Sequence, residues 1–124
     1  MEDKSGARKD DKGKLRFDLV PPQALMELVE VYNYGAESAG KEEKGYPDRN
    51  WESGMSWGRV FGAIMRHLWD FWRGEDLDKE SGLNHLAHAA WGCLTLLEYG
   101  RHYKELDDRS KLNEAVSTFK FKTF

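Results

Sequence analysis

The sequence contains a single cysteine, Cys93, which excludes an internal disulfide and a cysteine-based zinc finger. This cysteine usage is typical of a reducing compartment, so we expect a cytoplasmic protein. An excess of charge of one sign is also missing, because 19 lysines and arginines against 22 aspartates and glutamates leave a net charge of −3. Non-specific phosphate contacts need a basic excess, so we do not expect a nucleic-acid polymer as ligand.

Long apolar segments are missing as well. The first residues lack the apolar stretch of a signal peptide. The longest uncharged stretch, Ser81–Leu97, has 17 residues and contains several polar side chains, so it is too short and too polar to cross a bilayer. We expect no membrane partner and interpret this stretch as a buried helix.

Several signatures of nucleotide chemistry are absent. The sequence has no phosphate-binding loop GxxxxGK[ST], no dinucleotide-binding GxGxxG and no nucleophile elbow GxSxG. It also has no His-Asp dipeptide, which disfavours a phosphohydrolase of the HD type.

The sequence does contain enough apolar and aromatic material for one packed domain, with 124 residues of which 40% are hydrophobic and 13% aromatic. Its apolar periodicity predicts an all-α fold, a small bundle of three main helices plus a short C-terminal element. We divide the chain into a charged N-terminal arm (1–18), a helical domain (19–100) and a C-terminal extension (101–124).

Apolar spacing and end signals place the predicted helices at Pro21–Gly35, Trp57–Arg73 and Leu83–Tyr99. Ser56 is the predicted N-cap of the second helix. A long loop (36–55) and an acidic connector (74–82) join the helices. Residues 103–116 suit a fourth, short helix, and the alternation in residues 117–124 suits a short strand or an ordered tail.

The third predicted helix has two distinct faces. Its predicted core face consists of Leu83, Leu86, Ala87, Ala90, Leu94 and Leu97. A second stripe is small or carries polar groups, and consists of His85, His88, Gly92, Thr95 and Tyr99. Because this helix has no charge before Glu98, we expect it to be largely buried and its polar stripe to face something polar.

The tryptophans predict either core packing or an oligomer interface. Four of the five lie in or near the second helix, at Trp51, Trp57, Trp69 and Trp72. Three helices alone would bury so many large side chains poorly, so we expect a homo-oligomer, a dimer or a tetramer, to complete the fold.

Two groups of residues suit a metal ion. His85 and His88 lie at i, i+3 on one helical face, close to the acidic connector, and this mixture suits Mg²⁺ or Mn²⁺. Glu27 and Glu30 lie three residues apart on the first helix and would complete a divalent-metal site if they faced the connector. The alternatives are core histidines with ordinary hydrogen bonds and a solvated carboxylate face.

Other residues suit a nucleotide. Arg66, beside His67, either grips phosphate or neutralises nearby carboxylates. Lys14 in the arm can reach a phosphate. Asn50 and Trp51 can read and stack a nucleobase.

A family resemblance rests on three segments, DDKGKLRFDLVPPQAL, DRNWESGMSW and RHLWDFWRGEDLDKESGLNHLAHAAW. They resemble the phage dATP/dGTP diphosphohydrolase family, a branch of the all-α MazG-like nucleotide pyrophosphohydrolases. The likeness covers about residues 6–100, and its most specific part is RH followed by GExxDxESGxxHxxH.

The resemblance implies an oligomeric α-helical enzyme that uses Mg²⁺ or Mn²⁺. Such enzymes split a purine deoxynucleoside triphosphate, dGTP or dATP, between the α and β phosphates into the monophosphate and pyrophosphate. In phages that replace adenine with 2-aminoadenine, the dGMP so formed feeds synthesis of the modified nucleotide.

The positions that match the family pattern are Arg66, His67, Glu75, Asp78, Glu80, His85 and His88. The implied metal ligands are Glu27, Glu30, Glu75 and Asp78. Arg66, His67 and Lys14 would hold the triphosphate, while His85 or His88, with Glu75, would activate water. The second ligand pair of MazG-like enzymes is helical, so His85 and His88 are the alternative ligands to the connector carboxylates.

Two readings from other classes remain. A phage protein that sequesters a host immune signal would use the same Arg, His and Trp residues to bind a nucleotide without cleaving it. A purely structural helical module would bind no nucleotide.

Overall fold

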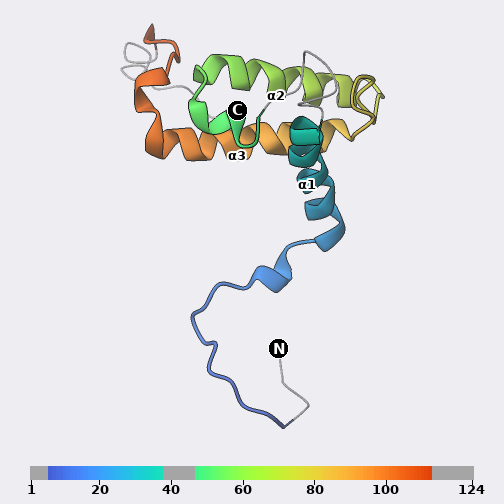
Figure 1. Cartoon of the computed structure of the whole chain (residues 1–124), viewed down its shortest axis with the longest axis vertical. Coiled ribbons are helices and arrows are strands. Elements are labelled where there is room, and N and C mark those ends of the chain that lie inside the picture. Colours follow the sequence, from blue (N-terminus) through green and yellow to red (C-terminus); the bar gives the residue numbers. More distant parts are fainter. Residues whose placement is uncertain (1–5, 38–46, 113–124) are drawn as a thin grey trace, which may run out of the picture.

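The computed structural model describes residues 6–37 and 47–112. Within them lie three α-helices, α1 (Pro22–Glu37), α2 (Trp57–Trp72) and α3 (His85–His102), and three short 3-10 turns, η1 (Phe17–Leu19), η2 (Asn50–Ser53) and η3 (Lys104–Leu106). These two ranges contain no strand, so the prediction of an all-α fold with three main helices is confirmed (Figure 1).

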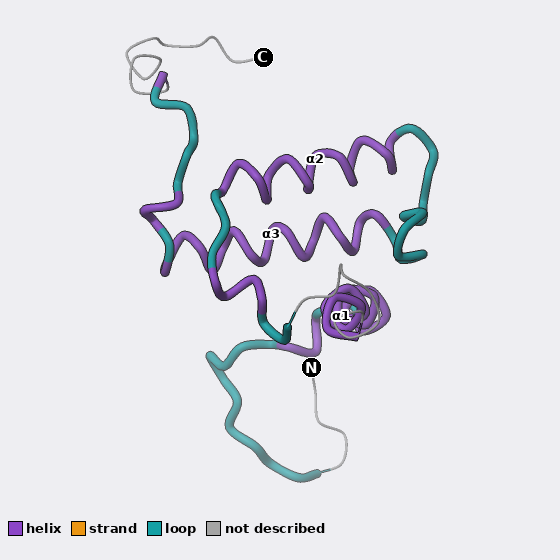
Figure 2. Tube along the Cα trace, turned by 45° about the horizontal axis from the view of Figure 1, so that its top comes forward, coloured by secondary structure: helices purple, strands orange, loops and turns teal. Residues whose placement is uncertain are grey.

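The helices are not all side by side. Helices α2 and α3 run antiparallel along each other, and residues 73–84, which we call the acidic turn, join them (Figure 2). Helix α1 crosses this pair and contacts α3, where the rings of Tyr32 and Trp91 are 6.2 Å apart. The N-terminal arm extends away from the helices (Figure 1). No helix in the described ranges is long and apolar enough for a membrane span.

The helix bounds agree closely with the predicted ones, and the differences have local causes. Helix α3 begins at His85 rather than Leu83, because the side chain of Asn84 caps it by accepting a hydrogen bond from Leu86 N at 2.9 Å. Ser56 is the N-cap residue of α2, but its side chain makes no capping hydrogen bond. The carboxylate of Asp108 accepts one from Gly58 N at 2.7 Å instead.

The predicted fourth helix is reduced, in its described part, to the 3-10 turn Lys104–Leu106 and a helical start at Leu112. The rest of that segment and the predicted strand or tail at 117–124 lie outside the described residues.

The predicted core face of the third helix is wrong for its exposed leucines, whereas Ala87 is buried as predicted. The buried residues of α3 are His85, Ala87, Ala89, Gly92, Thr95 and Tyr99, which are mostly the stripe expected to face a polar group. Leu86, Leu94 and Leu97 are exposed, and Leu97 keeps 71% of its surface. The small side chains of the stripe allow α2 to approach closely, which a row of leucines would prevent.

At Gly92, α3 lies in close contact with α2. A Cβ atom on this glycine would lie 2.4 Å from Cγ1 of Ile64. The core forms beside this contact and contains Val60, Ile64, Ala89 and Tyr99. Trp51 and Trp57 pack against this core, whereas Trp69 and Trp72 keep 61% and 77% of their surface exposed.

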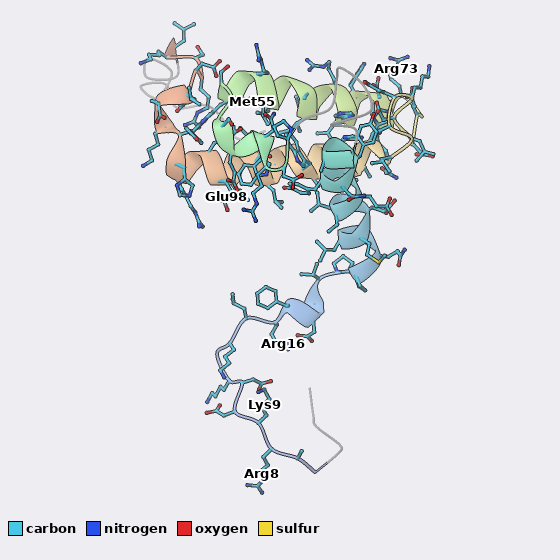
Figure 3. All side chains as sticks on the ribbon, viewed as in Figure 1. Arg8, Lys9, Arg16, Met55, Arg73 and Glu98 are labelled. Carbon is cyan, nitrogen blue, oxygen red and sulfur yellow. The ribbon has the colours of Figure 1, made fainter. Side chains whose placement is uncertain are left out.

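Hydrogen bonds attach the segment before α2 to the C-terminal end of α3. The hydroxyl of Tyr99, a fully buried residue, donates to Trp51 O at 2.5 Å, and the hydroxyl of Tyr103 donates to Glu52 O. The indole nitrogen of Trp57 donates to Tyr103 O at 3.1 Å. Met55 lies in this same region (Figure 3).

Candidate functional site

Three histidines come together where α2, α3 and the acidic turn meet. His67 comes from α2, whereas His85 and His88 lie on the first turn of α3. Glu75, Asp78 and Ser81 approach them from the acidic turn. We call these six residues the histidine cluster.

The backbone of the acidic turn is held in place by its own hydrogen bonds. Asp78 N donates to Leu83 O at 2.8 Å, and His85 N donates to Asp76 O at 2.9 Å. Gly82 allows the chain to reverse between them, because it adopts a φ of 73° that other residues rarely tolerate. The turn therefore holds Glu75 and Asp78 in defined positions beside the histidines.

His85 is the most buried member of the cluster, with 1% of its surface exposed. Its Nε2 lies 3.1 Å from Oε1 of Glu75, and its Nδ1 lies 2.9 Å from Nδ1 of His67. A carboxylate only accepts hydrogen bonds, so Nε2 of His85 carries the proton and Nδ1 has a lone pair. That lone pair accepts the Nδ1 proton of His67.

His88 connects to the acidic turn through Ser81. The Ser81 hydroxyl lies 2.7 Å from Nε2 of His88 and 2.9 Å from Oδ2 of Asp78, which also accepts a hydrogen bond from Ser81 N at 2.9 Å. The rings of His67 and His88 are stacked, with centroids 4.5 Å apart. Ser81 therefore links a carboxylate to an imidazole.

The electrostatics of the cluster favour neutral His67 and His88 beside an ionised Asp78. Burial lowers the pKa of His67 and of His88, and the attraction of Asp78 offsets this only in part. For Asp78, burial acts to raise the pKa, but the hydrogen bonds from the Ser81 backbone and hydroxyl outweigh it and hold the pKa below its ordinary value. Near neutral pH Asp78 is thus ionised, and His67 and His88 are neutral.

Three members of the cluster are placed to share one ion. His67, Asp78 and His85 each offer a ligand atom, and these atoms all lie within 4.8 Å of one another. Among the described residues no other set of His, Cys, Asp and Glu side chains does so.

The structure does not bring the predicted carboxylate set together within one chain. Glu27 and Glu30 are exposed on α1, and of the four predicted metal ligands only Asp78 belongs to the three-residue set. Glu75 contacts His85 instead. The expectation of one site made of two carboxylate pairs therefore lacks support from a single copy of the chain.

The predicted nucleotide-binding residues are also dispersed. Arg66 is exposed and lines a shallow recess on α2 with Met65, Trp69 and Asp70, and no cluster residue lines that recess. Asn50 and Trp51 lie at the C-terminal end of α3, about 20 Å along the helix from His85. Lys14 is exposed on the arm, where the basic side chains Arg8, Lys9 and Arg16 also project away from the helices (Figure 3).

Ser81 is the cluster residue that sequence reasoning missed. Its signal was its place in the ESG segment of the acidic turn, three residues after Asp78 and seven before His88. Asp78, Ser81 and His88 can meet only if the chain reverses its direction before α3 begins, and Gly82 allows this reversal.

Comparisons with known proteins give a family and one curated relative. Residues 4–109 match the family described as "dATP/dGTP diphosphohydrolase, N-terminal". A protein of Salmonella phage PMBT28 named dATP/dGTP diphosphohydrolase is 31% identical over 101 residues, which cover 82% of this chain and 32% of that protein. The chain thus spans about a third of the length of this relative. No solved structure matches it.

Proposed function

Because the chain belongs to the dATP/dGTP diphosphohydrolase, N-terminal, family, we propose that it is a hydrolase of deoxynucleoside triphosphates. The reaction converts dGTP or dATP with water into the monophosphate and pyrophosphate. In a phage that uses 2-aminoadenine, the dGMP would feed synthesis of the modified nucleotide. The name of the phage relative supports the substrate class, although this chain covers only a third of that protein.

The observation that carries the proposal is the histidine cluster. Hydrolysis of a phosphoanhydride needs a base for water and positive charge on the phosphates. His88 is the base we propose, because it is partly exposed and has a pKa lowered by burial, so its imidazole is neutral near pH 7. His85 is too buried to meet water directly, and with Glu75 it would hold His67 in position.

We propose Mg²⁺ or Mn²⁺ as the cation that accompanies the triphosphate. Asp78 is the acidic side chain at the cluster that would hold it, whereas Glu75 faces Nε2 of His85. The bound ion would neutralise phosphate charge and make water more acidic. Arg66 and Lys14 lie outside the cluster of their own chain, so their proposed role in holding phosphates depends on a second copy.

The exposed leucines of α3 support a homo-oligomer. Residues Ser81–Leu97 carry no charge, yet Leu86, Leu94 and Leu97 are exposed in a single copy. A helix that is apolar on more than one face is normally covered on each of them. We propose that a second copy of this chain covers this face, as a dimer or as part of a tetramer.

The test is incubation of the purified protein with each of the eight common nucleoside and deoxynucleoside triphosphates and Mn²⁺ or Mg²⁺. We expect dGMP or dAMP together with pyrophosphate. A His88→Gln variant should lose at least ten-fold in kcat, whereas His102→Gln, on the exposed end of α3, should keep the activity. Absence of product from all eight nucleotides would refute the hydrolase.

A second candidate is a nucleotide-binding protein that does not cleave. It is favoured by the placement of Glu27 and Glu30, which are exposed on α1 and do not belong to the set of His67, Asp78 and His85. A sponge for a host immune signal would release intact nucleotide when the complex is denatured, and its binding would need no metal. Recovery of the monophosphate would exclude it.

A further inference from the structure

We infer that His67, His85 and Asp78 bind one divalent transition-metal ion, and that this site prefers such an ion over Mg²⁺ or Ca²⁺. Two imidazoles and one carboxylate supply the ligands, and the remaining positions are open to water or a phosphate oxygen. A role of this ion in hydrolysis rests on the proposed function. Binding of the ion to these residues does not depend on the proposed function.

The first support is the convergence of ligand atoms from three separate elements. His67 is on α2, His85 on α3 and Asp78 in the acidic turn, yet their ligand atoms lie within 4.8 Å of one another. The two imidazoles meet through Nδ1 atoms 2.9 Å apart, with one proton between them. A metal ion that replaces this proton would be held by both nitrogens, while the His67 proton moves to Nε2.

The second support is the carboxylate behind His85. Glu75 accepts a hydrogen bond from Nε2 of His85 at 3.1 Å, which leaves the Nδ1 lone pair directed at His67. Metal-binding histidines almost always donate their other ring proton to such a partner, which orients the ring and makes the ligand more basic. The burial of His85, at 1% exposure, keeps this ring in one position.

The third support is the fixed orientation of Asp78. Its Oδ2 accepts two hydrogen bonds from Ser81, one from the backbone and one from the hydroxyl, both at 2.9 Å. The 3.9 Å approach of Nε2 of His88 also involves Oδ2.

The donor set decides which ion is preferred. Mg²⁺ and Ca²⁺ prefer oxygen ligands throughout, whereas imidazole nitrogen suits Zn²⁺, Fe²⁺, Ni²⁺ and Cu²⁺. Three protein ligands with an open position are typical of catalytic rather than structural zinc sites. The same open position would let the ion contact a phosphate oxygen.

The test uses the full chain without a histidine tag. The protein is dialysed against Co²⁺ or Zn²⁺ in an excess of Mg²⁺, and the retained metal is measured by elemental analysis. We expect one ion per chain, with visible absorption bands from the Co²⁺-loaded protein that show nitrogen ligation. His67→Gln and Asp78→Asn should lose this binding, and Glu75→Gln should weaken it by about 10–100-fold.

His102→Gln is the matched control, because His102 lies on the same helix with 68% of its side chain exposed and outside the cluster. It should bind metal like the unmodified chain. Circular dichroism shows whether each variant keeps its helices. Binding that survives both His67→Gln and Asp78→Asn, metal below one ion per two chains, or displacement of Co²⁺ by Mg²⁺ at equal concentration would overturn the inference.

The outcomes for this inference and for the proposed function are distinguishable, because dialysis contains no nucleotide. Metal binding without product from any triphosphate would refute the hydrolase and keep the metal site. Product formation in Mg²⁺ alone, with no retained Co²⁺ or Zn²⁺, would refute the metal site and keep the hydrolase.

Discussion

The hydrogen bond between His67 and His85 constrains the protonation of the cluster. Their Nδ1 atoms are 2.9 Å apart, so the two rings share one proton at this contact and cannot both be doubly protonated there. The stacked ring of His88 adds a third imidazole within 4.5 Å of His67. Protonation of both His67 and His88 would place like charges side by side, which opposes the uptake of protons by these rings.

We predict that mild acid destabilises the fold through these histidines. Burial lowers the pKa of His67 and His88 below 6.5, so between that value and the folded pKa the unfolded chain binds more protons than the folded one. Stability therefore rises with pH in this window and falls as the pH drops through it. Thermal unfolding at pH 7.5 and at pH 5.5 measures the effect.

The control for the pH prediction is His88→Gln, which removes one of the titrating rings. Its Tm should fall less than that of the unmodified chain between the two pH values. An equal fall in both proteins would show that the pH dependence comes from other groups.

The close contact of α2 with α3 depends on small residues in the buried stripe of α3. Gly92 lies against Ile64, and Ala89 lies in the same core. The hydroxyl of Thr95 donates a hydrogen bond to Trp91 O at 2.9 Å within the same helix, so this polar side chain can be buried without a partner on α2. The distance between α2 and α3 therefore depends on the absence of a side chain at Gly92.

We predict that Gly92→Ala destabilises the helix pair. The added Cβ would lie 2.4 Å from Cγ1 of Ile64, so the helices must separate or Ile64 must change rotamer. Overpacking of this kind costs about 1–3 kcal/mol, which exceeds the gain of up to about 1 kcal/mol from the better helix propensity of alanine. Urea unfolding of both proteins measures the free energy of unfolding.

Gly100→Ala is the matched control for this prediction. Gly100 lies on the same helix and a Cβ there would meet no atom within 4 Å. This variant should keep or raise the free energy of unfolding. If Gly92→Ala and Gly100→Ala behave alike, the close approach at Gly92 does not limit the packing.

At the level of the whole molecule, a single copy leaves a large apolar surface uncovered. Besides the leucines of α3, the exposed apolar side chains include Phe61, Met65, Trp69 and Trp72 of α2 and Leu25, Met26 and Val29 of α1. Large exposed apolar patches mark interaction sites in soluble proteins, so these side chains are consistent with the proposed oligomer.

We predict that Leu97→Glu weakens the proposed oligomer. Leu97 keeps 71% of its surface exposed in one copy, and a two-fold interface would bury it twice. Loss of two leucine contacts costs at least about 3 kcal/mol, or more than a hundred-fold in the dissociation constant. Light scattering coupled to gel filtration should show a shift toward the monomer mass.

Leu112→Glu is the control, since Leu112 is exposed to 75% and lies outside α3. It should leave the mass unchanged. A monomeric unmodified chain at micromolar concentration would refute the proposed interface.

The local features of this protein follow from its amino-acid sequence alone. The periodicity and end signals of three segments predicted three helices within two to three residues of their observed ends, because helix formation depends on neighbouring residues. His85 and His88 were correctly expected on one helix, and the acidic turn was correctly expected between two helices. These features need only spacings along the chain.

Helix packing selects which faces are buried and which residues meet. The leucine face of α3 was expected in the core, but close packing at Gly92 selects the stripe of small and polar residues. His67 contacts His85, eighteen residues further along the chain, because α2 and α3 run antiparallel. Asp108 accepts a hydrogen bond at the start of α2, although it lies fifty residues after Gly58. Glu27 and Glu30 are exposed on α1 and do not belong to the set of His67, Asp78 and His85. Contacts between distant segments depend on how helices pack, and periodicity shows only that a face is available for packing.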